Sequence, residues 1–430
     1  MTADLRIPLG WLLTTVRSVL TVVRMRHRHL THAIEALCFN PHKIAMVSGP
    51  RQCGKTTFAK MMLHGRSEGR YCNWDDAEFR RLWVKTPSAI IPLQKGEATP
   101  LLVLDEIHKD RFWKRNLKGL YDTLERPCDI LVTGSARLDV YRRGSDSMVG
   151  RYFPFRLHPF SMRELEHKDV LPPDDMREAL FSRALSARKD SAGHLDDFMA
   201  YGPFPEPFLG QDARQARMWR QVHGQAVIRE DLRDISRLPD LGRVELMASL
   251  LPERVGSIFS LKRMTEDMEI SFDVLKRWLA YLKAAYFLFE IKPYSRRIPR
   301  SLKRDGKVYL WDYSAIKDKA ARFENLVAHH LLKTCHYWTD TGEGAFDLYY
   351  LRDKERAEID FLVTRDGEPW LPVEVKWSDT DPSPNWRKFA PMLSCKRELQ
   401  IVYQPEWKVH SFGEAQVLVA GAAEVLGYFA

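Results

Sequence analysis

The stretch "SGPRQCGKTT", Ser48 to Thr57, decides the fold of the first part of the chain. It matches the pattern G-x-x-x-x-G-K-[ST] and lies between the apolar run "IAMVSG" and the helical run "GKTTFAKMMLHG". Glycines in such a turn let backbone amides point toward a phosphate, and the helix N-terminus adds partial positive charge. The pattern predicts a phosphate-binding loop made of these residues: Gly49, Pro50, Arg51, Gln52, Cys53, Gly54, Lys55, Thr56 and Thr57.

A second motif, "LLVLDEIH", places two acidic residues, Asp105 and Glu106, at the end of an apolar strand. In a site of this kind Lys55 reaches the terminal phosphates of ATP, while Thr56 holds Mg²⁺. Asp105 is expected to contact Mg²⁺ through water, and Glu106 to polarise the water that attacks the phosphate. The two motifs together predict an ATPase that hydrolyses ATP rather than only binding it.

The strand "DILVTGS" ends in Thr133 and Ser135, which we expect to sense the γ-phosphate from the neighbouring strand. An ordinary turn at the end of a strand explains the same two residues equally well. Near-continuous apolar strands that alternate with helical stretches are typical of a parallel sheet covered on both faces. We therefore predict an α/β fold built on such a sheet over residues 25–165.

These motifs are followed in order by "VGRYFPFRLHPFSMREL" and "YGPFPEP". The series resembles the bacterial and archaeal AAA-type ATPases that carry a GPRQ-GKTT loop, fused to a C-terminal domain of unknown function. The resemblance covers residues 25–430 and implies a homo-oligomer such as a ring. It also implies that Arg151 completes the site of a neighbouring subunit; the alternatives are a surface position or an ion pair with an acidic helix of its own chain. Two positions depart from the family pattern: Cys53 replaces an aliphatic residue, and Pro203 replaces a glycine.

The chain of 430 residues is too long for one ordinary core. We expect an N-terminal extension (1–24), a P-loop ATPase core (25–165), a helical lid (166–225), a winged-helix-like module (226–315) and a small α/β domain (316–430). The extension contains an apolar run, Ile7 to Val23, that Arg17 interrupts and that is short for a membrane span. We interpret it as a leading helix, or as sequence upstream of a start at Met25.

The middle of the chain predicts a helix-turn-helix followed by a basic hairpin. Apolar residues recur at helical spacing over Leu261 to Met268 and Phe272 to Ala285, with a short turn between them. The basic stretch "SRRIPRSLKRDGK" then supplies side chains that we expect to grip DNA phosphates: Arg296, Arg297, Arg300, Lys303, Arg304 and Lys307. The alternative is that the module serves oligomerisation or docking within the chain.

Four residues near the C-terminus predict a metal-dependent nuclease. Glu324 lies on an amphipathic helix, Asp360 in the strand "AEIDFLV", and Glu374 and Lys376 on one face of the strand "PVEVKWS". Asp360 and Glu374 are expected to bind Mg²⁺ or Mn²⁺, with Glu324 as an outer ligand and Lys376 orienting or deprotonating the water.

The order of helices and strands around these residues resembles the PD-(D/E)xK nuclease superfamily, which has a restriction-endonuclease-like fold. The alternative is a structural ion pair of Lys376 with a carboxylate, without catalysis. The adjacent His329 and His330 are expected to be one packed and one solvated, because neighbours on a helix point apart.

The net charge of +9 favours a polyanionic partner, and the six cysteines show no CxxC spacing, which argues against structural zinc and disulfides. These features fit a cytoplasmic protein, for which a membrane partner is not expected. A peripheral membrane ATPase anchored by Ile7 to Val23 is the less favoured alternative. We therefore expect a Mg²⁺-dependent ATPase that acts on double-stranded or branched DNA in genome maintenance or defence. The alternative is an ATP-dependent switch or scaffold whose C-terminal half binds protein and does not cut DNA.

Overall fold

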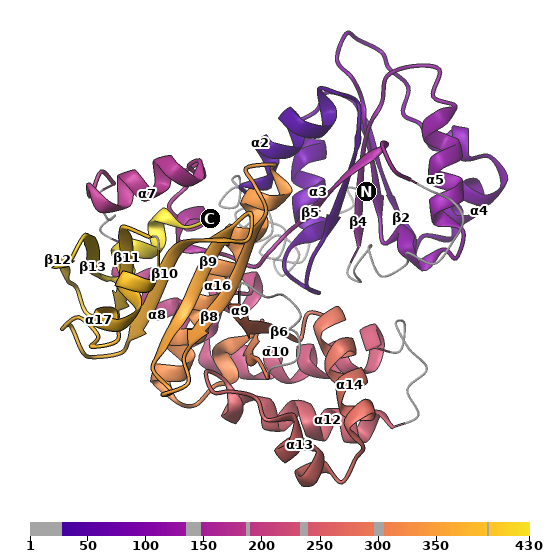
Figure 1. Cartoon of the computed structure of the whole chain (residues 1–430). Coiled ribbons are helices and arrows are strands. Elements are labelled where there is room, and N and C mark those ends of the chain that lie inside the picture. The colour runs from indigo at the N-terminus through magenta and orange to yellow at the C-terminus, as the bar shows by residue number, and fades with distance from the viewer. Residues whose placement is uncertain (1–27, 135–147, 186–189, 233–239, 296–304, 394) are drawn as a thin grey trace, which may run out of the picture. The chain divides into compact units, whose positions relative to one another are not determined.

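The computed structural model describes residues 28–134, 148–185, 190–232, 240–295, 305–393 and 395–430 (Figure 1). The chain divides into two compact units, which are described separately below. The first comprises Met1–Met46, Gly54–Thr133 and Met148–Tyr152, and the second comprises Val47–Cys53, Gly134–Ser147 and Phe153–Ala430. The apolar run Ile7 to Val23 lies outside the described residues. No helix within the described part of the chain is both long and apolar enough to cross a membrane.

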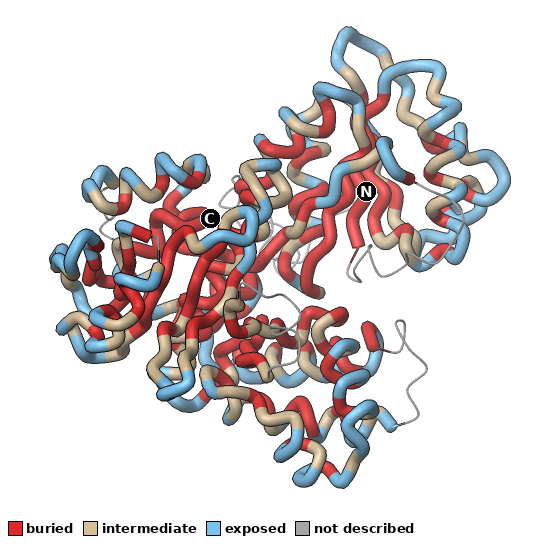
Figure 2. Tube along the Cα trace, viewed as in Figure 1, coloured by how far each residue is buried: buried red, intermediate tan, exposed pale blue. Residues whose placement is uncertain are grey.

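A five-stranded sheet has the order β2-β3-β4-β1-β5. Its strands are β1 (Ile44–Ser48), β2 (Gly69–Asn73), β3 (Leu101–Asp105), β4 (Asp129–Gly134) and β5 (Tyr152–Arg156). β3 pairs in parallel with β2 and with β4. Every residue of β1, β3 and β4 is buried, which explains why these runs are apolar throughout (Figure 2). The predicted parallel sheet is confirmed.

In the first unit a short helical segment precedes β1, and each later α-helix follows a strand, as in other parallel α/β folds. They are α2 (Leu30–Ile34), the π-helical turn η1 (Glu35–Phe39), α3 (Lys55–His64), α4 (Ala77–Lys85) and α5 (Trp113–Asp122), with short 3₁₀ turns at Pro87–Ile90 and Ile107–Lys109. α3 begins directly after the left-handed Gly54, so the phosphate loop leads straight into a helix N-terminus. α4 begins at Asp76, whose side chain accepts a hydrogen bond from the Glu78 amide.

The middle of the chain is helical. Its helices are α6 (Met162–Leu165), α7 (Pro173–Phe181), α8 (Ser191–Tyr201), α9 (Pro205–Gly210), α10 (Ala213–Ala226), the π-helical turn η4 (Val227–Asp231), α12 (Leu241–Leu250), the 3₁₀ turn η5 (Leu251–Arg254), α13 (Leu261–Met268) and α14 (Phe272–Ala284). Ser260 and Ser271 cap α13 and α14, and the left-handed Glu269 ends α13. The two short helices form where the sequence predicted them.

An eight-stranded mixed sheet has the order β12-β13-β11-β10-β9-β8-β6-β7. Its strands are β6 (Leu288–Pro293), β7 (Lys307–Leu310), β8 (Phe346–Arg352), β9 (Glu358–Arg365), β10 (Glu368–Lys376), β11 (Arg397–Val402), β12 (Trp407–Phe412) and β13 (Ala415–Gly421). Its accompanying helices are α16 (Lys319–Asp340), α17 (Trp386–Phe389) and α18 (Ala422–Val425), with 3₁₀ turns at Tyr313–Ala315, Ala390–Met392 and Leu426–Tyr428. The sheet is mixed because β10–β11, β11–β13 and β6–β8 are parallel pairs among antiparallel ones.

The β6–β7 hairpin belongs to this sheet, although the sequence assigned it to a separate winged-helix module. Lys292 of β6 pairs with Tyr349 of β8, which joins the hairpin to the C-terminal strands. The basic residues Arg296, Arg297, Arg300, Lys303 and Arg304, predicted to contact DNA, lie outside the described residues. The structure therefore describes the base of the predicted wing, and this base is a pair of strands in a larger sheet.

The prediction for the two adjacent histidines of α16 was wrong, because both are buried. His330 Nε2 accepts a hydrogen bond from the Met162 amide at 3.1 Å. The His329 ring lies 5.7 Å from the ring of His158 and 5.6 Å from that of Trp311. Protein packs against α16 on more than one side, so neighbouring residues that point apart still both reach the interior.

Candidate functional site

The phosphate loop has the backbone that the glycine pattern requires. Gln52 and Gly54 adopt left-handed conformations, with φ of 60° and 99°. A Cβ atom at Gly49 would lie 2.2 Å from the Leu157 carbonyl oxygen, so only glycine fits there. Alternation of right- and left-handed residues turns successive amides to one side, which makes a concave anion site. Lys55, the first residue of α3, is buried.

The Asp105 carboxylate accepts hydrogen bonds from three hydroxyl groups of the first unit. The Thr56 hydroxyl donates to Asp105 Oδ2 at 2.8 Å, and the Tyr71 hydroxyl donates to the same oxygen at 2.6 Å. The Thr133 hydroxyl donates to Asp105 Oδ1. Three residues predicted for the site, Thr56, Asp105 and Thr133, therefore lie together. A hydroxyl beside a carboxylate provides the hard oxygen ligands that suit Mg²⁺.

Tyr71 is a site residue that the sequence analysis missed. Burial and the hydrogen bond to Asp105 raise the pKa of Tyr71 to about 12, so it remains a donor at neutral pH. The signal was a polar side chain near the end of β2, the strand beside β3. The parallel register places Asn73 opposite Asp105 and therefore brings Tyr71 near that strand end.

Glu106 has a strained backbone, with φ of 58° and ψ of 21°. A left-handed conformation costs a non-glycine residue about 1 kcal/mol or more, and such strain concentrates at functional sites. The Glu106 amide donates to the Thr133 carbonyl at 2.9 Å, which holds the residue at the end of β3. Its carboxylate lies 3.7 Å from His108 Nε2 and 3.8 Å from Lys109 Nζ.

Arg151 forms a two-point ion pair within its own chain. Its Nε lies 2.7 Å from Asp122 Oδ1, and its Nη2 lies 2.9 Å from Asp122 Oδ2 at the end of α5. The hydrogen bond from Arg151 holds the pKa of Asp122 below its usual range. This is the arrangement expected from the alternative of an acidic helix in the same chain. Action on a neighbouring subunit stays a prediction and requires this pair to open.

In the second unit, the loop residues Arg51 and Gln52 contact the helical region. Arg51 Nη1 lies 2.9 Å from Asp231 Oδ1, and Nη2 lies 2.5 Å from Glu230 Oε2. Gln52 Oε1 lies 2.9 Å from His223 Nδ1. The sequence did not predict these partners, because they lie 171 to 180 residues farther along the chain.

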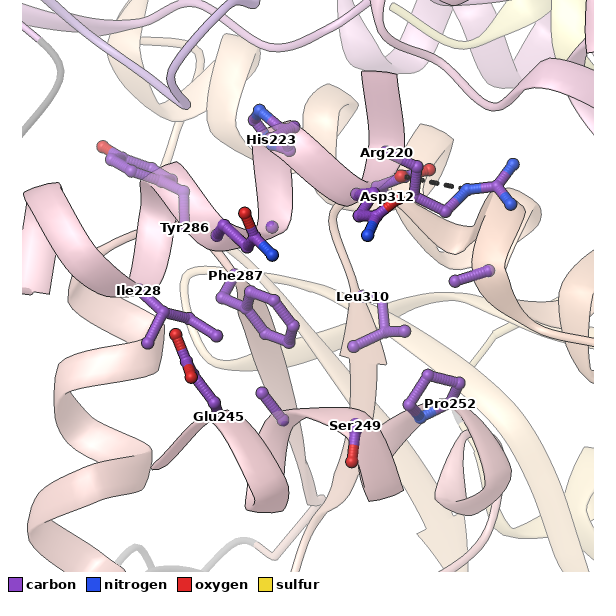
Figure 3. A pocket seen from close by; sticks show the side chains of 15 residues that line it. Arg220, His223, Ile228, Glu245, Ser249, Pro252, Tyr286, Phe287, Leu310 and Asp312 are labelled. Atoms are coloured by element: carbon purple, nitrogen blue, oxygen red, sulfur yellow. Dashed lines mark ion pairs between the residues drawn. The ribbon is translucent and has the colours of Figure 1, made fainter. Parts of the chain in front are cut away.

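A cavity of about 470 Å³ lies in the helical region of the second unit (Figure 3). Phe287, Ile228 and Leu310 form its apolar surface, and Arg220, which lies 3.7 Å from Asp312, is at its polar side. His223 and Tyr286 also line it. Both residues also contact the segment that holds the phosphate loop, His223 through Gln52 and Tyr286 through its hydroxyl, which lies 3.4 Å from Ser48 Oγ.

The predicted C-terminal residues Asp360, Glu374 and Lys376 lie together on β9 and β10. The Asp360 amide donates to Glu374 Oε2 at 3.3 Å, and the Val375 amide donates to Asp360 Oδ2 at 2.9 Å. Lys376 Nζ lies 2.7 Å from Glu374 Oε1. Burial and the neighbouring Asp360 raise the pKa of Glu374 to about 7.

Lys307 corrects one prediction, because it does not project from a wing toward phosphates. Its side chain is only 2% exposed, and its ammonium lies 2.5 Å from Glu358 Oε1 and 3.5 Å from both Glu324 Oε1 and Asp360 Oδ1. Burial alone would lower the pKa of Lys307, but the three carboxylates outweigh it and hold the pKa above its usual range. We call the group formed by Glu324, Glu358, Asp360 and Glu374 the carboxylate cluster.

The sequence analysis also missed Glu358. Glu358 precedes Asp360 by two residues on one strand, and this spacing would have placed both side chains on the same face. Across the described residues, no group of three or more His, Cys, Asp or Glu side chains is arranged to hold a metal ion. Ser135, predicted beside Thr133, lies outside the described residues.

Three family models match successive parts of the chain. Residues 41–166 match the AAA domain, residues 192–322 match the domain of unknown function DUF8612, and residues 319–422 match the domain of unknown function DUF4143. An uncharacterized protein of Mycobacterium tuberculosis is 21% identical over 392 residues, which are 89% of this chain and 80% of that protein. An uncharacterized protein of Haemophilus influenzae is 21% identical over 351 residues, covering 76% of this chain and 80% of the relative.

Among solved structures, the Walker-type ATPase PABY2304 of Pyrococcus abyssi aligns with 68% of this chain and 94% of its own, at 13% identity and a TM-score of 0.39. DnaA from Aquifex aeolicus, bound to AMPPCP, aligns with 59% of this chain and 86% of its own, at 11% identity and a TM-score of 0.29.

Proposed function

We propose that this chain, whose residues 41–166 form an AAA-type P-loop ATPase domain, hydrolyses ATP with Mg²⁺ and uses the reaction to act on DNA. The contact of Thr56 with Asp105, next to the strained Glu106, carries the hydrolysis part of the proposal. Thr56 and Asp105 hold Mg²⁺, which neutralises charge on the phosphates when bound. Lys55 contacts the terminal phosphates, and Glu106 orients and polarises the attacking water.

Action on DNA is supported by charge and by the helical middle of the chain. The net charge is +9, and six basic residues lie in the segment from Ser295 to Lys307. Lys307, the one of the six within the described residues, is buried among carboxylates. The α13–α14 pair has the short connection of a helix-turn-helix. In this proposal α14 approaches a groove of double-stranded or branched DNA, and the five remaining basic residues contact phosphates.

One observation favours a second candidate function, an ATP-dependent switch or scaffold that binds protein. The β6–β7 hairpin is built into the eight-stranded sheet through β8, so the module docks within its own chain. Metal-dependent cleavage by the C-terminal domain is supported by Asp360, Glu374 and Lys376 together. The position of Lys307 among the same carboxylates weighs against it.

The test is the rate of ATP hydrolysis by the full chain with and without single-stranded, double-stranded and branched DNA. We expect double-stranded or branched DNA to raise the rate, because productive contacts couple the DNA module to the ATPase. Lys55→Ala should show no hydrolysis under any of these conditions. A rate that no DNA alters would favour the protein-binding switch, provided that Lys55→Ala again abolishes it.

A further inference from the structure

The carboxylate cluster leaves little of its surface for a metal ion. Seven of its eight oxygens have a partner within 3.5 Å. Lys307 contacts three of them, one each from Glu324, Glu358 and Asp360. The remaining four partners are Arg352 on Glu358, the Val375 amide on Asp360, and Lys376 and the Asp360 amide on Glu374.

The eighth oxygen, Glu324 Oε2, faces the backbone at Gly256. A Cβ atom at Gly256 would lie only 2.9 Å from it, and Gly256 has a φ of +75°. The Tyr309 hydroxyl also donates to Glu324 Oε1 at 2.7 Å, so one oxygen of Glu324 contacts Lys307 and Tyr309 and the other faces Gly256. Mg²⁺ needs octahedral coordination, with ligand oxygens about 2.0–2.1 Å away and usually several waters. A metal ion bound to Glu324 at such a distance would have to replace its contacts with Lys307 and Tyr309.

The charges of the cluster are already balanced almost completely by fixed cations. Four carboxylates face Lys307, Lys376 and Arg352, which bring three positive charges. A divalent ion placed between Glu324 and Asp360 would take the position of the Lys307 ammonium and would be repelled by it. Lysine and metal are therefore mutually exclusive occupants of this position.

We propose that Lys307 is the resident cation of the carboxylate cluster, so that the C-terminal domain holds no divalent metal there and does not cleave phosphodiesters by a metal-dependent route. The ammonium stabilises the junction of β7, α16 and β9 in the way that a bound metal would. Asp360, Glu374 and Lys376 then serve as the ion pairs of a binding module. This inference does not depend on ATP hydrolysis, because the cluster lies wholly within the second unit.

The test is to titrate the nucleotide-free full chain with MnCl₂. Calorimetry measures Mn²⁺ binding, and the thermal unfolding temperature measures stability. Wild type and Asp360→Asn should give the same Mn²⁺ isotherm, since the cluster adds no site in the wild type. Lys307→Met should unfold at a lower temperature without metal, because buried carboxylates lose their cation. Mn²⁺ should restore much of that loss, because a ligand that binds only the folded state stabilises it.

The double variant Lys307→Met with Asp360→Asn should not recover with Mn²⁺. Lys408→Met, a change at an exposed lysine of β12, is the matched control and should behave like wild type. Mn²⁺ binding by wild type that Asp360→Asn removes would overturn the proposal, and this comparison holds even where Lys307→Met fails to fold. A folded Lys307→Met that gains no response to Mn²⁺ would also overturn it.

Discussion

Gly49 is the residue at which the phosphate loop tolerates no side chain, because a Cβ atom there would lie 2.2 Å from the Leu157 carbonyl oxygen. We expect Gly49→Ala to weaken ATP binding and to destabilise the fold by about 1–3 kcal/mol, the usual cost of overpacking. Gly65→Ala is the matched control, since its Cβ would meet nothing nearer than 3.5 Å. Calorimetric ATP binding and chemical unfolding measure both effects. Equal behaviour of the two variants would show that the loop can shift without cost.

Glu398 of β11 predicts a pH dependence of stability. It is fully buried, neither carboxylate oxygen has a hydrogen-bond partner among the described residues, and burial raises its pKa to about 8 from an ordinary value of 4.5. A raised pKa means that the folded state keeps its proton longer than the unfolded state. The contribution of this group is therefore fully present below about pH 4.5 and is lost as the pH rises through about 8.

Glu398→Gln should remove this dependence, because the amide does not ionise. The measurement is the free energy of unfolding of both proteins from pH 5 to pH 9, with the exposed Glu414→Gln as control. We expect the wild type to lose stability relative to Glu398→Gln as the pH rises, and Glu414→Gln to follow the wild type. Parallel curves for wild type and Glu398→Gln would refute the assignment.

At the scale of elements, local sequence patterns predicted the strands and helices that form from contiguous residues. The buried strands β1, β3 and β4 were visible as apolar runs, and α13 and α14 as apolar residues at helical spacing on either side of a short turn. Contacts between distant segments were not visible. Lys307 belongs to a basic stretch in the sequence, and only the pairing of β7 and α16 with the rest of the sheet makes it a buried partner of Glu324 and Asp360.

The part of the candidate ATP site that lies in one continuous segment was predictable for the same reason. The residues that strand pairing brings to the site were not. Gly54, Lys55 and Thr56 follow one another in the chain, so their motif is complete in the sequence. Tyr71 reaches Asp105 because β2 pairs with β3, and the partners of Arg51 lie in the helical region. A single sequence gives no signal for pairings of this kind.

The basic segment between β6 and β7 is predicted to contact DNA phosphates. Reversing Arg296, Arg297 and Arg300 to Glu should weaken DNA binding and flatten the dependence of affinity on salt, because fewer condensed counterions are released. A matched control reverses three exposed lysines that are scattered over the chain: Lys95, Lys317 and Lys396. It makes the same change in net charge. An equal loss of affinity in both triple variants would mean that only overall charge matters, which would contradict a defined DNA contact.

At the scale of the whole molecule, we propose a homo-oligomer in which neighbouring subunits share catalytic residues. If Arg151 leaves Asp122 to complete a neighbouring site, then Arg151→Ala and Lys55→Ala should each be inactive alone. Mixed oligomers should recover part of the activity, because some interfaces combine an intact loop with an intact arginine. The measurement is ATP hydrolysis of mixtures whose association is verified by light scattering. Associated mixtures without recovery would assign Arg151 to its ion pair with Asp122 alone.

The role of Glu106 in ATP hydrolysis is tested most directly by measuring both the hydrolysis of ATP and the binding of ATP by Glu106→Gln. Glutamine keeps the shape of the side chain but cannot polarise water as a carboxylate does. We predict that ATP binding is retained and that the hydrolysis rate falls by about 10²–10⁴-fold. The exposed Glu97→Gln, in the same unit, should hydrolyse ATP at the wild-type rate. Hydrolysis by Glu106→Gln at the wild-type rate would contradict the account.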